Sequence, residues 1–148
     1  MEIATKYLGI LEIDEEKIIQ FPNGIPGFIK ETKFVILDFP DNPIFQILQS
    51  VQNENIAFVI TDPYLIYRDY SFKLDETILE VLRIESEKDV LVSSIVTIKN
   101  PFEHSTINLK APIIINPNRL LGKQYILNDE DYPSKATINP VTIESGAK

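Results

Sequence analysis

Short apolar runs alternate with turn-forming residues along almost the whole chain. The runs are rich in Ile, Val, Phe and Thr, which suit the half-buried surface of a sheet. Asn23-Gly24 and Asp62-Pro63 are among the turns between them. The predicted strands cover residues 3–8, 10–13, 17–21, 34–39, 45–50, 56–61, 90–98, 106–110, 113–116 and 124–127. Many short strands at this spacing predict a mainly β chain with a single-domain, antiparallel, barrel-like fold.

One segment departs from the strand pattern. Apolar residues at positions 78, 79, 81 and 82 have helical spacing, and Asp75 precedes them as an N-cap. Leu74 and Leu79 occupy the two positions of a hydrophobic staple around that cap. The pattern predicts one short helix, from about Asp75 to Leu82, packed on the barrel.

The chain shows neither an internal repeat nor a domain boundary. Its 148 residues are most simply one domain. The last residues are polar and contain Pro140 and Gly146. We therefore expect a single β domain over residues 1–135 and a flexible C-terminal tail over residues 136–148.

Composition limits where the protein works and which chemistry it can use. The chain has no cysteine, which excludes disulfides, thiolate metal sites and cysteine nucleophiles together. No apolar segment reaches the roughly 18 residues of a membrane helix, and the N-terminus lacks the pattern of a secretory signal. These features predict a cytoplasmic protein that does not bind membranes.

The charge balance is acidic, with 22 Asp and Glu against 14 Lys and Arg and a formal net charge of −8. The basic residues are scattered singly, whereas direct nucleic-acid binding needs clustered Lys and Arg. An acidic surface attracts basic proteins instead. The alternative is that the negative charge serves only solubility.

Residues able to support catalysis are scarce. His104 is the only histidine, and its neighbour Ser105 would point away from it in an extended or turning chain. Asp129-Glu130-Asp131 lacks the spaced oxygens and central glycine of a calcium loop, and the five glycines form no phosphate-binding loop. We predict no catalytic, cofactor or metal site. A small hydrolase that uses His104 or a pair of acids is the enzyme alternative.

Two segments look built for either packing or recognition. Residues 24–28, Gly-Ile-Pro-Gly-Phe, form a stiff loop that either closes one end of the barrel or contacts a partner. Asn108 and Asn116 flank a strand that Pro112 interrupts, and their amides either satisfy freed backbone groups or face a partner. The tyrosines at 64, 67 and 70 likewise suit a core or an interface.

Together these segments resemble the FliW family of flagellar assembly factors. The most specific parts are residues 24–28 and the run Asn-Leu-Lys-Ala-Pro-Ile-Ile-Ile-Asn at 108–116. Weaker similarities follow in order at residues 45–50, 62–63, 93–98, 124–127 and Tyr132. The resemblance covers roughly Glu2 to Tyr132.

The resemblance implies a bacterial, non-catalytic protein with a small β-barrel-like fold. Proteins of this family bind flagellin and also bind CsrA, an RNA-binding dimer that represses flagellin translation. Sequestering CsrA relieves that repression, and flagellin competes for FliW. The expected partners of this chain are therefore flagellin and CsrA, and we expect a monomer when it is free. A generic β-barrel interaction module with another partner is the alternative function.

Candidate partner contacts come from the stiff loop, the acidic clusters and the 108–116 segment. For flagellin we expect docking of an amphipathic or extended segment at the rim of the loop. For CsrA we expect acidic side chains to attract a basic surface. The candidates are Ile25, Pro26, Phe28, Glu85, Glu87, Asp89, Asn108, Lys110, Asp129 and Asp131.

Overall fold

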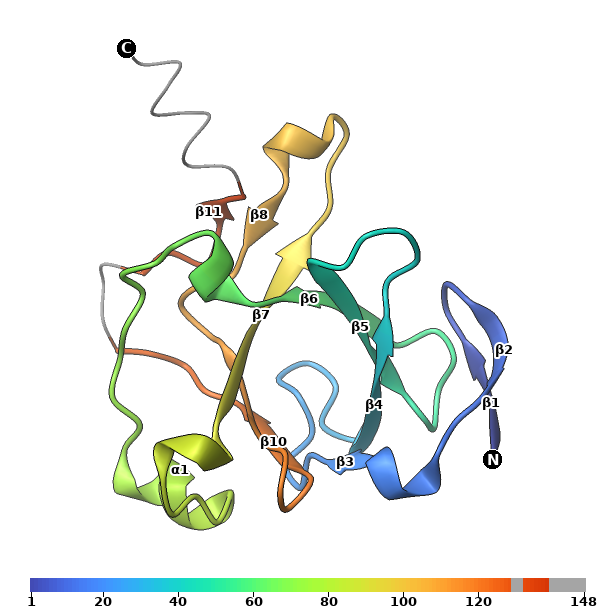
Figure 1. Cartoon of the computed structure of the whole chain (residues 1–148), viewed down its shortest axis with the longest axis horizontal. Coiled ribbons are helices and arrows are strands. Elements are labelled where there is room, and N and C mark those ends of the chain that lie inside the picture. Colours follow the sequence, from blue (N-terminus) through green and yellow to red (C-terminus); the bar gives the residue numbers. More distant parts are fainter. Residues whose placement is uncertain (129–131, 139–148) are drawn as a thin grey trace.

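A closed barrel of seven β-strands forms the body of the protein in the computed structural model, which describes residues 1–128 and 132–138 (Figure 1). The barrel order is β7, β6, β5, β4, β3, β10 and β9, and β9 pairs back onto β7. All of these pairs are antiparallel except β3 with β10, which is parallel and joins Gln20 to Leu121. The barrel therefore closes through one short parallel seam.

The strands are short, and only one helix is α-helical in the described residues. The strands are β1 (Glu2–Thr5), β2 (Gly9–Glu12), β3 (Ile19–Gln20), β4 (Lys33–Asp38), β5 (Phe45–Ser50), β6 (Ala57–Thr61), β7 (Leu91–Thr97), β8 (Thr106–Ile107), β9 (Ile113–Asn116), β10 (Leu121–Gln124) and β11 (Ala136–Thr137). The helices are α1 (Glu76–Val81) and the 3-10 turns η1 (Glu15–Lys17), η2 (Pro63–Leu65), η3 (Glu87–Asp89) and η4 (Phe102–His104).

The predicted mainly β, barrel-like fold and its single short helix are confirmed. Asp75 caps α1 as expected, because its carboxylate accepts a hydrogen bond from the Ile78 amide at 2.9 Å. The strand predicted at residues 124–127 is wrong. The returning strand, β10, starts at Leu121, directly after the turn that follows β9, and Ile126 is exposed beyond its end.

The start predicted for the C-terminal tail is also corrected. Ala136 and Thr137 pair with Ile107 and Thr106 as β11, and Ile138 is buried. These residues remain attached because they cover apolar side chains on the outside of the barrel. The rest of the predicted tail, residues 139–148, lies outside the described residues.

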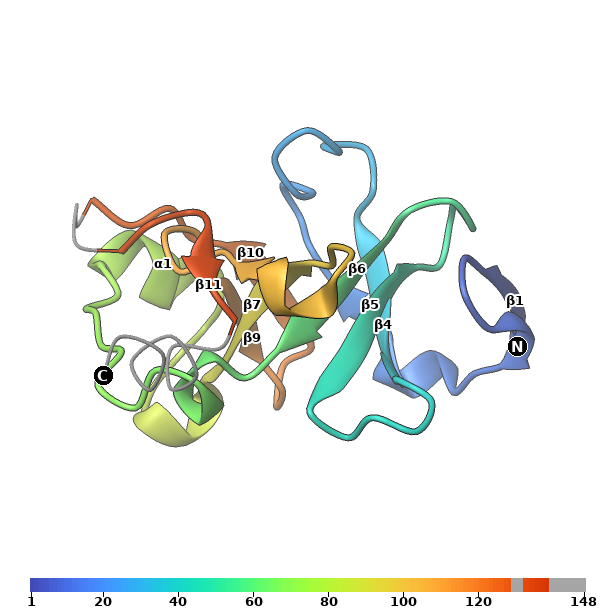
Figure 2. The ribbon, with the colours of Figure 1, turned by 90° about the horizontal axis from the view of Figure 1, so that it is seen from above.

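The barrel interior is filled by alternate residues of its strands. Phe34 and Ile60 point inward from β4 and β6, and Phe21 packs edge-on against Phe34 with ring centroids 5.1 Å apart. The loop between β3 and β4 stands out from the strands in Figure 2. One of its residues, Ile25, turns back into the interior cluster and is 1% exposed.

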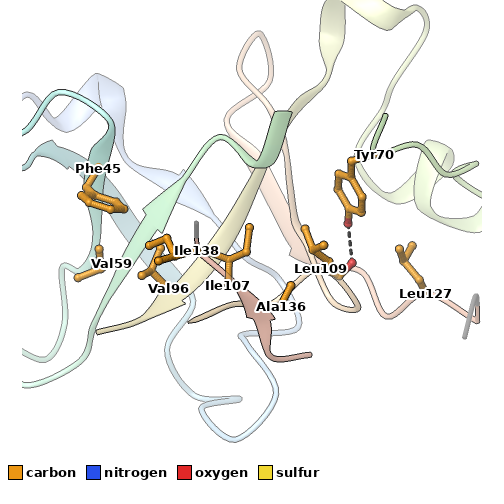
Figure 3. Packing of buried hydrophobic residues seen from close by; sticks show 9 residues of the cluster. All are labelled: Phe45, Val59, Tyr70, Val96, Ile107, Leu109, Leu127, Ala136 and Ile138. Carbon is orange, nitrogen blue, oxygen red and sulfur yellow. Dashed lines mark hydrogen bonds between the residues drawn. The ribbon is translucent and has the colours of Figure 1, made fainter. Parts of the chain in front are cut away.

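Three further clusters cover the outside of the barrel. The β1–β2 hairpin packs Ile3 and Ile13 on Val35 of β4, and α1 packs Ile78 and Leu82 on Ile114 of β9. The largest outer cluster lies where β8 and β11 extend the sheet beyond β7 (Figure 3). Its members are Phe45, Val59, Tyr70, Val96, Ile107, Leu109, Leu127, Ala136 and Ile138. The outer clusters therefore hold the N-terminal hairpin, α1 and the C-terminal strand against the barrel.

Tyr70 holds the outer cluster through a buried hydroxyl. The hydroxyl donates a hydrogen bond to the Leu109 carbonyl at 2.6 Å (Figure 3). The Tyr70 ring packs edge-on against Tyr132, with ring centroids 4.8 Å apart. Burial raises the pKa of Tyr70 above its ordinary value, with Tyr64 and Tyr132 adding to the effect. The folded protein therefore keeps this proton at a pH where the unfolded chain releases it.

This difference predicts a loss of stability in alkali. Because the folded-state pKa is raised, the stabilisation is complete below the unfolded pKa of about 10 and declines as the pH rises above it. We expect the free energy of unfolding, measured with urea between about pH 8 and 11, to fall less steeply in Tyr70→Phe than in the parent. Equal slopes in the two proteins would contradict this assignment.

Candidate functional site

The connection between β6 and β7 builds the candidate site. These strands are antiparallel neighbours, which two residues could join, yet residues 62–90 lie between them. Figure 1 shows this connection running down one side of the barrel to α1 and back to the start of β7. Hairpin connections are usually about 2–5 residues long, so this connection is unusually long and contains η2, α1 and η3.

The connection and the start of β7 enclose an open cleft of 760 Å³. Its walls are mainly apolar and come from three places, namely the chain before α1, the C-terminal half of α1 and the chain that leads into β7. The apolar lining includes Phe72, Leu74, Leu79, Ile84, Val90 and Val92. This size lies within the range of clefts that hold small molecules or several side chains of a partner.

The end of α1 explains why two of these apolar residues meet in the cleft. The Ile84 amide donates to the Leu79 carbonyl and the Arg83 amide to the Glu80 carbonyl, which together form a Schellman motif. Arg83 takes the left-handed position of that motif with φ 54°. The motif reverses the chain, so that Leu79 and Ile84 both line the cleft.

Asn116 fixes the same helix end to the barrel. Its buried amide donates to the Leu82 carbonyl at 2.7 Å and to the Arg83 carbonyl at 3.1 Å. The backbone-satisfying interpretation of this residue is therefore correct. Its acceptors are the last turn of α1, however, and not groups next to Pro112.

The rim of the cleft carries more acidic than basic side chains. Asp62, Glu85 and Glu87 line it together with a single lysine, Lys73, and all four are exposed. Glu85 and Glu87, which we selected from the sequence, are thus brought beside an apolar surface. This arrangement gives the cleft an apolar floor and a negative edge.

Asp89, the third acid selected in this cluster, has a structural role. Its carboxylate accepts hydrogen bonds from the Glu85 amide at 3.0 Å, the Ser86 amide and the Asn118 side chain. The Glu85 amide, followed by the Asn118 side chain, lowers the pKa of Asp89. The carboxylate therefore holds the acidic turn in shape and is already engaged by the chain itself. Asp129 and Asp131 lie outside the described residues.

In the stiff loop at residues 24–28, some side chains pack inside the barrel and others are exposed at the surface. Ile25 is a correction, because it fills the barrel interior and cannot contact a partner at the surface. Pro26 and Phe28 are exposed, and the Phe28 ring packs edge-on against Phe58 at 5.5 Å. Gly24 takes φ +65°, and a Cβ there would lie 2.6 Å from the Ile29 backbone, so the tight loop requires glycine.

The 108–116 segment is mostly structural. The Asn108 side chain accepts a hydrogen bond from the Ala111 amide at 3.0 Å and holds the turn between β8 and β9. Lys110 is exposed, and its carbonyl accepts from the Leu127 amide. These two residues lie far along the chain from the cleft residues and do not line the cleft.

The enzyme alternative finds little support at His104. The histidine is exposed, whereas Ser105 is 1% exposed and its hydroxyl accepts a hydrogen bond from the Lys99 amide at 2.8 Å. The pair is thus split between the surface and the interior. No three His, Asp or Glu side chains within the described residues converge in a way that would hold a metal ion.

Sequence reasoning missed the apolar half of the site. The helical spacing indicates Leu79 as a packing residue of the helix. The aromatic residues near position 70 suit either a core or an interface, and the sequence does not show where in the fold they lie. The signal that could have found the cleft is the length of the 62–90 connection between two adjacent strands. Only the register of β6 with β7 reveals that this connection is unusually long.

The fold and the cleft define a small single-domain β-barrel protein with a mainly apolar surface cleft that also carries acidic residues. A model of the FliW family, described as "FliW protein", matches residues 2–138. The chain therefore belongs to the FliW family. No helix among the described residues has the length and apolar character needed to cross a membrane.

Several known proteins are similar to this chain in sequence over nearly its full length. The flagellar assembly factor FliW of Oceanobacillus iheyensis is 54% identical over 146 residues, which cover 99% of each chain. That of Bacillus subtilis is 46% identical over 138 residues, covering 93% of this chain and 96% of the relative. A crystal structure of the flagellar assembly factor FliW superposes with a TM-score of 0.90 at 43% identity, covering 95% and 98% of the two chains. These relatives are named as assembly factors and not as enzymes.

Proposed function

We propose that this chain is a non-catalytic flagellar assembly factor that binds flagellin and antagonises CsrA, which relieves repression of flagellin translation. The observation that carries the proposal is the family match over residues 2–138. The protein would act in the cytoplasm, as a monomer when free. Neither direct RNA binding nor a cofactor is part of the proposal.

The charge of the chain supports the CsrA half of this function. A net charge of −8 favours association with a basic RNA-binding protein and repels mRNA phosphates once the two are docked. The exposed Phe28 and Pro26 support the flagellin half, because they offer an apolar rim to an amphipathic or extended segment.

Calorimetric titration against CsrA and, separately, against flagellin tests the function. We expect binding to both, with flagellin displacing CsrA. Reversing the acids of residues 12–16, of residues 85–89 or of residues 129–131 should weaken CsrA binding for at least one cluster. Parental affinity in all three variants would refute the electrostatic contribution.

Phe28→Ala tests the rim assigned to flagellin. We expect a folded variant with weaker flagellin binding, and unchanged affinity would remove Phe28 from the site. If the folded parent protein binds neither CsrA nor flagellin, the generic interaction module becomes the better description.

A further inference from the structure

We propose that the cleft beside α1 is the docking site for a basic protein segment that inserts apolar side chains and places Lys or Arg against the rim. The inference rests on the proposed function, within which this chemistry belongs to CsrA and not to flagellin. The inference places the binding site for CsrA, the RNA-binding partner, at the face of the barrel that carries α1.

Much of the apolar lining of the cleft packs on the cluster formed by Ile78, Leu82 and Ile114, but a part of it stays exposed to solvent. Leu91 lines the cleft and remains 49% exposed at the start of β7, and Tyr64 of η2, which also lines it, is 38% exposed. Leu91 belongs to none of the buried clusters, whereas the Tyr64 ring also packs on Tyr70 with ring centroids 5.6 Å apart. Contiguous apolar surface with a polar edge typically marks a binding site.

The charges at the rim select the kind of segment. Asp62, Glu85 and Glu87 are exposed beside the apolar floor, and Lys73 is the one base among the described residues of the lining. A segment with apolar anchors and flanking Lys or Arg would bury its anchors and keep its charges at the solvent-exposed edge. An acidic segment would meet repulsion at that edge.

The walls are held in place before any partner arrives. Asn116 ties the end of α1 to β9, and the Asp89 carboxylate fixes the turn that carries Glu85. On the other wall, the Asp75 amide donates to the Tyr125 hydroxyl at 3.3 Å, which links the start of α1 to the chain after β10. A rigid cleft loses little conformational freedom on binding, which favours affinity.

Two cleft variants with matched controls test the proposal by titration against CsrA and flagellin. Leu91→Lys places a charge on the apolar surface, and Ile10→Lys is its control at a 72% exposed position on the β1–β2 hairpin. The double variant Glu85→Lys and Glu87→Lys reverses the rim. Its control, Glu54→Lys with Glu103→Lys, changes the net charge equally at exposed positions outside the cleft lining.

We expect each cleft variant to weaken CsrA binding at least about tenfold, which corresponds to about 1.4 kcal/mol. Both controls should stay close to the parent, and flagellin binding should be unchanged. Added salt should weaken CsrA binding more in the parent than in the rim variant. Because the rim residues are exposed, the rim variant remains informative even if Leu91→Lys fails to fold.

The outcomes separate this inference from the proposed function. If the parent binds CsrA and both cleft variants bind it equally well, the docking site is wrong while the function stands. If the cleft variants weaken only flagellin binding, the assigned occupant is wrong. A folded parent that binds neither protein overturns the function and this inference together.

Discussion

Phe21→Ala should lower the free energy of unfolding by about 3–5 kcal/mol, the largest effect expected from any substitution considered for this chain. Phe21 is fully buried in the barrel interior and follows β3 at the closing seam. That seam is a single parallel pair between Gln20 and Leu121. Losing the ring therefore opens a cavity where the barrel has the fewest backbone hydrogen bonds to compensate.

Gly122 provides a partner for a double-substitution test of the same contact. A Cβ built on Gly122 would lie 2.5 Å from the tip of the Phe21 ring, so Gly122→Ala should cost about 1–3 kcal/mol in the parent. In a Phe21→Leu background, the ring atoms that clash are absent. The same Gly122→Ala change should then cost less, because the two sites are coupled.

Urea unfolding of the parent, Phe21→Ala, Gly122→Ala, Phe21→Leu and the double variant Phe21→Leu with Gly122→Ala measures both effects. Domains of this size have total stabilities of roughly 5–15 kcal/mol, so Phe21→Ala is expected to leave the barrel only marginally folded. A loss below about 1 kcal/mol for Phe21→Ala would show that the barrel collapses around the missing ring. Additive costs of Gly122→Ala and Phe21→Leu would show that the two side chains do not compete for the same space.

Asn116→Leu should have the second largest effect, acting on α1 and the cleft. The substitution removes the donors to the Leu82 and Arg83 carbonyls. The buried Leu82 carbonyl left unpaired costs about 1–3 kcal/mol, whereas the Arg83 carbonyl is only partly buried and can bond to water. We expect a lower melting temperature, and hydrogen exchange should be faster at the α1 amides than in the barrel strands.

A matched control distinguishes the loss of the two Asn116 hydrogen bonds from the general effect of replacing an asparagine side chain by leucine. Asn55→Leu changes an exposed asparagine in the turn before β6 and should leave both stability and α1 exchange near the parent values. Uniform loss of protection across barrel and helix in Asn116→Leu would mean that Asn116 supports the whole fold and not the helix end. Unchanged protection at α1 would contradict its role altogether.

The local parts of this structure follow closely from the sequence. The short apolar runs became strands because alternation with a period of two suits a sheet with one buried face. The helix starts where Asp75 can accept a hydrogen bond from the Ile78 amide. This contact is local, because the two residues are three positions apart in the sequence. The family resemblance rests on the same kind of short-range information.

The errors all involve contacts between distant parts of the chain. The sequence predicts the last barrel strand three residues too late, because nothing near Gly122 shows that this residue fits against Phe21, which lies far earlier in the chain. Ala136 was assigned to a tail because its partner strand, β8, lies 30 residues earlier in sequence. The sequence leaves Ile25 open between closing the barrel end and contacting a partner, because nothing local shows which residues of the loop fold back into the barrel interior.

The candidate site likewise has parts that the sequence predicts and parts that only the tertiary structure reveals. Sequence alone identified Glu85 and Glu87 as an exposed acidic cluster and Asp75 as the start of the helix after the 62–74 segment, because charge and capping are local properties. Only the tertiary structure placed these acids beside the apolar residues of α1 and β7. It could do so because the pairing of β6 with β7 forces the 62–90 connection out of the barrel and back over its surface, and no short-range pattern encodes that pairing.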